Sequence, residues 1–323
     1  MRSASYEEFR DYIASFTLPK SALAVKKLFA DEKIKNNLKN AKFSCTGSEF
    51  MAIAPIMHRY LRNVVRSREQ EDMLPYIDSM LAVLDVVMML QSCRTGTIKP
   101  ADLMTAITGH LVLFVDSWGE QYIRPKHHYA LHLPDFLERF GYLLASFVHE
   151  RKHRLINKYT RDRHNLRAYE AGAIEDVTCH QLWECNEPFY FAAKESQPAG
   201  LMRTVVEDLF PDISVDAIKI LSDISLNGGR ASSGDVVAFF QDGRMQIGRL
   251  LISLGISSTT PTCYSFIANW QQIKLDGHWI TCTMSDNDVV KIESKYLDSV
   301  LINMQSLAES SCTMFLPPEL RPQ

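Results

Sequence analysis

The chain has 323 residues, of which 46% are hydrophobic and 23% are charged. This composition is that of a globular protein that buries a core, and it excludes disordered and collagen-like chains. The length exceeds what one hydrophobic core usually organises, and the formal net charge of −3 provides no overall basic excess for a nucleic-acid partner.

The first two thirds of the sequence predict one helix after another, because apolar residues recur there at helical spacing. Signals for the start and end of helices are the capping box Thr46-x-x-Glu49, the prolines Pro75 and Pro100, and the glycines Gly119 and Gly141. A further helix is expected from about Ala168 to Trp183. We therefore expect the N-terminal part to be mainly α-helical.

The pattern changes towards the C-terminus. The segment 186–200 has two prolines and few strong helix formers, so it is predicted as a linker region that short helices at 201–210 and 214–222 extend. From Gly234 onward, apolar runs are separated by Asp-Gly turns at 242–243 and 276–277, which are strong hairpin signals. The predicted strands are 236–240, 245–254, 263–273, 279–283 and 289–292.

These patterns together predict a multidomain protein of α and β structure. We expect a helical domain over residues 1–185, a linker region with short helices over 186–226, and a small antiparallel β-barrel over 227–323. The spacing of the hairpins favours a barrel of the SH3-like or BAH-like kind. Within it, Tyr264, Trp270 and Trp279 could line a methyl-lysine cage, although core packing is the expectation for them.

The cysteines and the apolar runs indicate the compartment. Seven widely spaced cysteines form no C-x-x-C pair, and the sequence starts without a secretory signal, so we expect reduced thiols in a nuclear or cytoplasmic protein that is not secreted. The most apolar run, Tyr76 to Leu90, contains Asp78 and Asp85 and is predicted as a core helix. No membrane partner is expected.

Positive charge is concentrated in one segment of this acidic chain. From Arg124 to Arg167 there are ten basic residues against four acidic ones, which gives +6 and leaves −9 for the remainder. Such a segment is typical of a phosphate-binding surface, so DNA is the expected partner. The candidate nucleic-acid-binding residues are Lys126, Arg151, Lys152, Arg154, Lys158, Arg161 and Arg163.

Histidines gather in the same region and allow a zinc alternative. The sequence His149-Glu150-Arg151-Lys152-His153 fits the H-E-x-x-H spacing of zinc hydrolases, in which two imidazoles bind the metal and the glutamate activates water. A structural zinc that also uses His128 or His132 is a second possibility. Charged residues at both middle positions, and Tyr159 where a third histidine would stand, count against a peptidase.

A resemblance to a known family covers roughly residues 20–185. The run PKHHYALHLP from Pro125 to Pro134, then Arg139-Phe140-Gly141, then FVHERKHR from Phe147 to Arg154, resembles the helical C-terminal region of CACTA-type (En/Spm-like) transposases. Upstream, the segment from Cys45 to Phe50 looks like the entry to the same region. The resemblance implies a transposon-derived, nuclear protein that binds nucleic acid.

The resemblance also implies a catalytic role that this chain does not complete. Transposases of the DDE class hold two divalent metal ions with three carboxylates, and Glu150 would be the third of them. Residues 1–120 are predicted to be helical, with no strand that ends in the first two aspartates. We therefore expect no catalysis and no cofactor for the isolated chain, with Mg²⁺ bound only if a partner supplies the catalytic core.

A third possibility places the function in the C-terminal barrel. In that case the barrel acts as a protein-interaction module, and the basic helical segment is only a solvated surface. Nothing in the barrel sequence has the spacing of a catalytic site.

Overall fold

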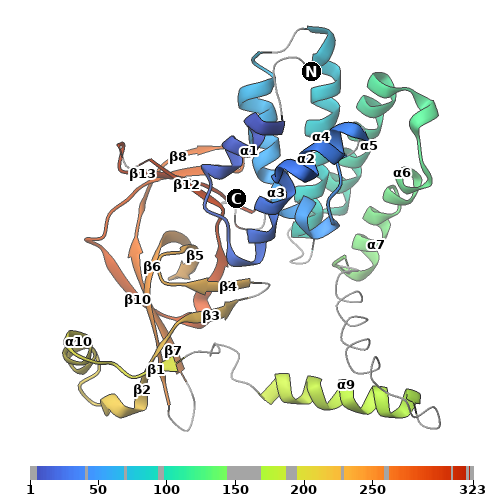
Figure 1. Ribbon diagram of the computed structural model, residues 1–323. Helices are drawn as coiled ribbons and strands as arrows, with labels where there is room; N and C mark the ends of the chain where they lie inside the picture. Colours follow the sequence, from blue (N-terminus) through green and yellow to red (C-terminus); the bar gives the residue numbers. More distant parts are fainter. Residues whose placement is uncertain are drawn as a thin grey trace.

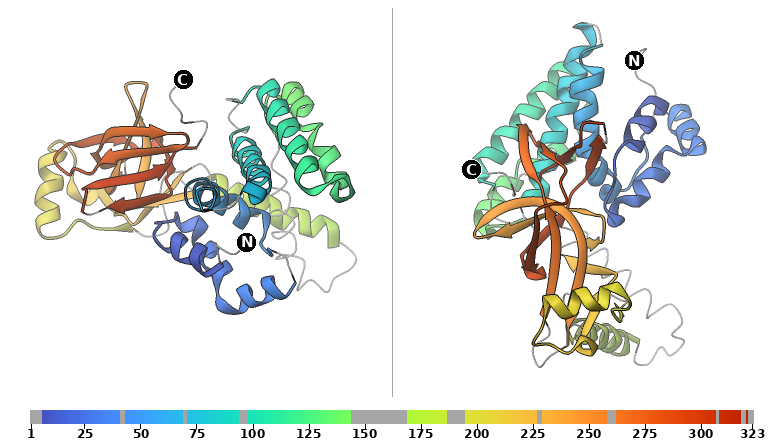
Figure 2. Two further views of the ribbon diagram at one scale, coloured as in Figure 1. Left: turned by 90° about the horizontal axis from the view of Figure 1, so that it is seen from above. Right: turned by 90° about the vertical axis from the view of Figure 1, so that its left-hand side faces the viewer.

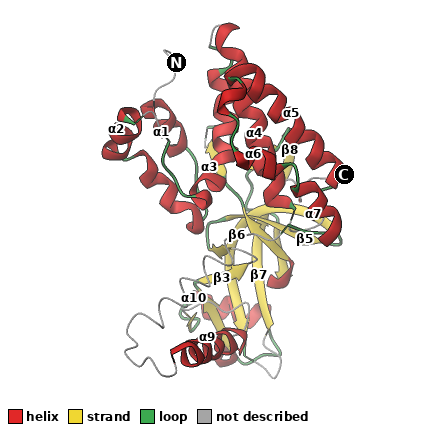
Figure 3. Ribbon diagram, turned by 90° about the vertical axis from the view of Figure 1, so that its right-hand side faces the viewer, coloured by secondary structure: helices red, strands yellow, loops and turns green. Residues whose placement is uncertain are grey.

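A computed structural model describes residues 6–40, 43–68, 71–93, 98–143, 169–186, 195–226, 229–257, 262–306, 308–317 and 320. Helices precede strands along the chain, from the blue and green helices to the yellow and red strands of Figure 1. Figure 3 shows helices α1 to α7 gathered at one end of the molecule and strands β3, β6 and β7 towards the other. The expected order of a helical region followed by antiparallel strands is therefore confirmed.

The helices of the described residues lie close to their expected positions. They are α1 (Tyr6–Ala14), α2 (Asp31–Lys39), α3 (Gly47–Tyr60), α4 (Leu74–Ser92), α5 (Pro100–Trp118), α6 (Pro125–Ala130), α7 (Leu133–Phe140), α9 (Tyr169–Asn186) and α10 (Leu201–Leu209). A 3-10 segment, η1 (Lys20–Phe29), joins α1 to α2, and a π-helical turn, η2 (Leu61–Val65), follows α3.

The predicted helix signals act as expected. At the start of α3, the Thr46 hydroxyl accepts a hydrogen bond from Glu49 N at 3.2 Å, and Thr46 N donates to Glu49 Oε2 at 2.7 Å. Each bond satisfies a backbone N–H that the helix leaves open. Gly119 and Gly141 end α5 and α7 with φ of 95° and 72°, where a side chain would be strained.

The strands form antiparallel sheets. They are β1 (Glu195–Ser196), β2 (Ile218–Leu221), β3 (Asp223–Leu226), β4 (Gly229–Ser232), β5 (Val236–Gln241), β6 (Arg244–Ile256), β7 (Thr262–Asn269), β8 (Gln271–Asp276), β9 (Trp279–Thr283), β10 (Val289–Glu293), β11 (Leu297–Val300), β12 (Asn303–Ser306) and β13 (Ser311–Phe315). Across the described residues, one seven-stranded sheet has the order β1-β2-β6-β5-β11, with β7 beside β6 and β10 beside β7. A four-stranded sheet has the order β12-β13-β9-β8, and β3 pairs with β4.

The long strand β6 organises the larger sheet. It pairs with β5 and then with β2 along one edge, and with β7 along the other. The turn from β5 to β6 is made by Asp242 and Gly243, whose positive φ values of 51° and 74° give a two-residue turn that fits the right-handed twist of the paired strands. Both predicted hairpins are present, but the second turn is made by Gly277 and His278, because Asp276 is the last residue of β8 and pairs with Trp279.

Two sequence predictions in this region are wrong. The segment 214–222 is not a helix, because Val215–Ala217 form one 3-10 turn and β2 then pairs with β6. The predicted strand 263–273 is divided at Trp270, whose backbone N–H donates to Ile247 O at 2.9 Å. At this corner the chain leaves the seven-stranded sheet and enters the four-stranded one.

The β region is a half-barrel, and the strands described do not close into a complete barrel. No ladder among them joins the seven-stranded sheet to the four-stranded sheet, so β8 and β12 remain edges. The two views of Figure 2 show the strands as curved layers beside the helices.

The helices and the half-barrel share one hydrophobic core. The largest buried cluster joins residues of α1, η1, α3 and α4 to Trp279 of β9 and Phe315 of β13. Thr17, just after α1, also exchanges two backbone hydrogen bonds with Asn303 of β12, at 2.7 and 3.1 Å. The helical and strand regions are thus packed against each other.

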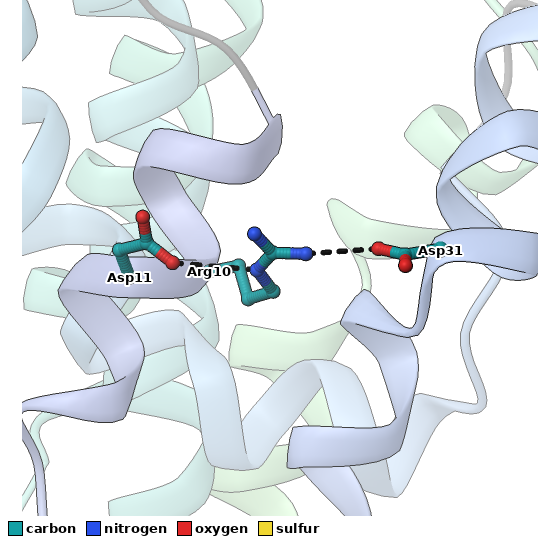
Figure 4. Close-up of polar contacts among 3 residues, drawn as sticks. All are labelled: Arg10, Asp11 and Asp31. Atoms are coloured by element: carbon teal, nitrogen blue, oxygen red, sulfur yellow. Dashed lines mark hydrogen bonds and ion pairs between the residues drawn. The ribbon is translucent and has the colours of Figure 1, made fainter.

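Polar contacts hold the first two helices together at the surface. Arg10 of α1 pairs with Asp31 of α2 at 2.9 Å and with its neighbour Asp11 at 3.3 Å (Figure 4). All three side chains are exposed, so solvent screens the pairs and each stabilises the fold by less than about 1 kcal/mol.

One helical segment of the described chain, Glu71–Ser92, is long and apolar enough to cross a membrane, with a mean hydropathy of 1.7. The core helix of a globular protein satisfies the same criterion. Here α4 packs between α3 and α5, and its residues Ile77, Leu84 and Met88 are buried.

Candidate functional site

The described part of the basic segment 124–167 consists of α6 and α7, with the residues that flank them. The predicted site residues Lys126, His128 and His132 lie there. The others lie outside the described residues: His149, Glu150, Arg151, Lys152, His153, Arg154, Lys158, Arg161 and Arg163. The H-E-x-x-H alternative and the proposed third carboxylate therefore stay predictions.

The sequence positions α6 and α7 through local signals. Pro125 and Pro134 occupy the first turns of the two helices, where proline needs no hydrogen-bond partner. Arg124 N donates to His127 Nδ1 at 3.1 Å and so caps α6. The turn between the two helices places His128 and His132 next to each other.

Among the predicted site residues that the structure describes, these two histidines lie in direct contact. Their Nε2 atoms are 3.3 Å apart, and the ring planes are nearly perpendicular at 86°. On its other side, His132 Nδ1 lies 4.0 Å from Asp135 Oδ2. Within the described residues, no group of three or more His, Cys, Asp and Glu side chains is arranged to hold a metal ion.

Aromatic side chains are unusually exposed around the same helices. Tyr129 is 64% exposed and Phe140 is 50% exposed, and Phe136 stacks on Phe140 with a centroid distance of 6.4 Å. The Arg139 guanidinium lies over the Phe140 ring at 5.2 Å. Exposed aromatic rings beside cationic groups can stack on unpaired bases or dock a partner protein.

A fourth histidine, His110 of α5, behaves differently. Burial lowers its pKa, and the nearby His127 lowers it further, while a hydrogen bond with the Ser79 backbone acts in the opposite direction. Its ring packs edge-on to Phe114 at 6.0 Å. His110 therefore adds no positive charge to this surface at neutral pH.

The half-barrel contains a cleft of about 620 Å³ beside the corner at Trp270. Its lining is rich in amides and includes Gln246, Asn269, Gln271 and Gln272 together with Asp288. Asn269 Nδ2 donates to Asp288 Oδ2 at 3.0 Å, which fixes one wall. Amide side chains both donate and accept hydrogen bonds, so the cleft suits a polar ligand such as a peptide backbone.

The three aromatic residues considered for a methyl-lysine cage do not gather at one site. Trp270 and Trp279 are both buried, in two different core clusters. Tyr264 packs against Phe210 with a centroid distance of 5.6 Å, and the Lys291 ammonium lies over its ring at 4.7 Å. The cage hypothesis is wrong, and the expected core role is confirmed for the two tryptophans.

Sequence reasoning missed the exposed edge strand β8. All six of its residues are exposed, including Ile273 at 61% and Leu275 at 44%. A register shift between Gln272 and Lys274 leaves Ile273 without a partner in the ladder. The sequence offered one unused signal, because Gln271 to Asp276 are mostly polar although they follow a buried strand.

Comparisons with protein-family models, with curated proteins and with solved structures find no match to this chain.

Proposed function

We propose that this protein is a transposase-derived, nuclear nucleic-acid-binding protein that uses the basic segment 124–167. The observation that carries the proposal is the charge of +6 in that segment, in a chain whose net charge is −3. Because the rest of the chain is acidic, a phosphate backbone is attracted to this segment and repelled elsewhere.

The exposed side chains of α6 and α7 support the same proposal. Lys126 and Arg139 are exposed there, and Tyr129, Phe136 and Phe140 lie between and beside them in the sequence. Cationic groups neutralise phosphates, and aromatic rings stack on bases without regard to sequence. This combination favours single-stranded or distorted DNA over a perfect duplex.

In this proposal the chain does not cut DNA alone. Glu150 is the third carboxylate of a DDE site by resemblance only. Two further carboxylates are needed beside it to hold a pair of metal ions. A separate catalytic core would supply these partners together with Mg²⁺. The residues Arg151, Lys152, Arg154 and Lys158 hold phosphates next to it.

A binding measurement at low salt tests the proposal. We expect the full chain to bind a labelled DNA duplex and, more tightly, a single strand of the same sequence. A variant with Arg151, Lys152, Arg154 and Lys158 replaced by Ala is expected to lose most of this binding. If the unaltered chain binds neither DNA at low salt, the proposal fails.

The half-barrel supports a second candidate function, a protein-interaction module of the SH3-like or BAH-like kind over residues 227–323. The observation that favours it is β8, an edge strand with apolar residues exposed beside an amide-rich cleft. An open edge can accept an extended peptide as a further strand.

Proximity labelling in cells tests this second function. Partners that the unaltered chain labels are expected to be lost when Ile273 becomes Lys in β8. They are expected to remain when Val289 becomes Lys, because this residue is also exposed but lies on a different edge strand, β10. A role for β8 would be contradicted if both variants lose the same partners, or if both variants keep them.

A further inference from the structure

A pair of imidazoles on α6 and the turn that follows it forms a possible ligand set that the nucleic-acid proposal does not use. His128 and His132 are both exposed, and their Nε2 atoms are 3.3 Å apart. This short distance has two explanations. Either one ring donates a hydrogen bond to the other, or both nitrogens face a common cation.

The geometry of the pair agrees with a shared cation. Two Zn–N bonds of about 2.0–2.1 Å at a tetrahedral angle place the two nitrogens about 3.3 Å apart. The ring centroids are 4.9 Å apart, farther than the nitrogens, so the rings diverge from the Nε2 atoms. Ligand rings diverge in the same way around one metal ion.

We propose that His128 and His132 chelate one zinc-type divalent cation through their Nε2 atoms. With Nε2 on the metal, each neutral ring carries its proton on Nδ1. For His132 this N–H faces Asp135 Oδ2, 4.0 Å away. At this distance the carboxylate is too far away to accept a hydrogen bond, but its negative charge favours a proton on Nδ1 and strengthens Nε2 as a ligand, so Asp135 acts as a positioning residue.

The ligand chemistry selects the class of metal. Imidazole nitrogens suit Zn²⁺, Cu²⁺ and Ni²⁺, whereas Mg²⁺ and Ca²⁺ prefer oxygen ligands. Within the described residues no third side chain joins the pair in a metal-binding group. In this proposal the two imidazoles are the only protein ligands required, and water completes the coordination. An ion held by two protein ligands exchanges readily, and its open positions can accept a further ligand.

This site is independent of the DNA-binding proposal. It uses neither Lys126 nor the charged residues 151–163, and it could exist in a protein that binds no DNA. Loss of DNA binding in the fourfold alanine variant therefore does not test metal binding. Loss of metal binding in a histidine variant likewise does not test DNA binding.

Calorimetric titration of the full chain with Zn²⁺, after removal of metal by a chelator, tests the site. We expect one equivalent of Zn²⁺ to bind to the unaltered chain in addition to whatever the double variant His128→Ala/His132→Ala binds. Each single alanine variant is expected to bind this Zn²⁺ at least about tenfold more weakly, because a single imidazole cannot chelate the ion. Asp135→Asn is expected to weaken Zn²⁺ binding about tenfold, as loss of a carboxylate behind a ligating histidine does.

The matched control is His127→Gln, which removes a neighbouring imidazole of α6, leaves the pair intact and keeps a side-chain acceptor for Arg124 N at the start of the helix. It is expected to bind Zn²⁺ as the unaltered chain does, and millimolar Mg²⁺ is expected not to compete. Far-UV circular dichroism verifies that the variants fold, and the ¹⁵N shifts of the His128 and His132 Nε2 atoms should move on titration. Equal Zn²⁺ binding by the unaltered chain and the double variant would overturn the proposal.

Discussion

The ring of Phe16 lies against the indole of Trp279, with centroids 5.7 Å apart and planes inclined at 60°. Phe16 follows α1 and is 1% exposed, and Trp279 begins β9 and is 6% exposed. Phe315 of β13 also packs against Trp279, with ring centroids 5.7 Å apart, and the Arg59 guanidinium of α3 lies over the indole at 4.7 Å. Residues 263 positions apart in the chain thus share one buried site.

This relationship predicts that the N-terminal helices and the half-barrel unfold together. Replacing Phe16 by Ala leaves a cavity beside Trp279, so the free energy of unfolding should fall by about 3–5 kcal/mol. Denaturant titration followed by tryptophan fluorescence and by far-UV circular dichroism should show the same shift with both probes.

The control for this variant is Phe140→Ala, because Phe140 is 50% exposed and its removal opens no cavity. Its effect should stay within about 0.5 kcal/mol. Two separate transitions, of which Phe16→Ala shifts only one, would contradict a common core.

Local features of the fold were predictable because they depend on neighbouring residues. The capping box at Thr46, the prolines that start α4 and α5 and the hairpin at Asp242-Gly243 each act within a few positions of the chain. The corner at Trp270 was not predicted, although the sequence becomes mostly polar directly after it, from Gln271. It depends on the contact with Ile247, a residue far from it in the sequence.

In the candidate site, too, some features follow from the local sequence and others depend on the folded arrangement. The basic character of 124–167 can be counted directly, and the i, i+4 spacing of His128 and His132 predicts neighbours on a helix. The distance of 3.3 Å between their nitrogens was not predictable, because the turn between α6 and α7 sets it. The exposure of β8 depends on which strand ends the four-stranded sheet, and the sequence does not specify that order.

The salt dependence of DNA binding should report how many phosphates the basic segment contacts. If Arg151, Lys152, Arg154 and Lys158 each neutralise one phosphate of a duplex, their replacement by Ala should reduce the slope of log K against log salt by about 3.6. Fluorescence anisotropy over a series of salt concentrations measures this slope.

A control for total charge replaces Lys27, Lys33, Lys35 and Lys39 by Ala. These four exposed lysines of η1 and α2 give the same change in net charge outside the basic segment. Their loss should leave the slope nearly unchanged. An equal reduction in both variants would show that net charge, not the basic segment, determines binding.

Thiol reactivity should distinguish the exposed cysteine Cys179 from four buried ones. Cys93, Cys263, Cys282 and Cys312 are buried, and burial raises the pKa of the first three to about 11 and that of Cys312 to about 12. Cys179 is exposed on α9. Because the thiolate is the reactive form, iodoacetamide at pH 8 should modify Cys179 first and leave the four buried thiols unmodified.

Peptide mass spectrometry of the alkylated native protein checks this order, and a sample denatured in urea shows that all the thiols can react. Alkylation of Cys282 or Cys312 as fast as Cys179 in the native protein would show that β9 and β13 open readily.

The same buried thiols predict a loss of stability in alkali. Cys282 and Cys312 face each other across β9 and β13, and burial is the main reason that their pKa values are raised to about 11 and about 12. In the unfolded chain a thiol loses its proton near pH 8.5. Between these values the folded state holds more protons than the unfolded state, so stability falls as the pH rises.

Below about pH 8.5, these thiols should therefore have little effect on the free energy of unfolding. From there towards pH 11 this free energy should decline, with a slope that approaches 2.303RT per pH unit for each thiol. Replacing both Cys282 and Cys312 by Ala removes two of the titrating groups and should flatten this alkaline decline, even though the variant is less stable at neutral pH. Cys179→Ala, which removes the exposed thiol of α9, is the control and should leave the slope unchanged. Denaturant titrations at a series of pH values give the slope directly, and equal alkaline slopes in the double variant and the unaltered chain would show that these two thiols are not protected by the fold.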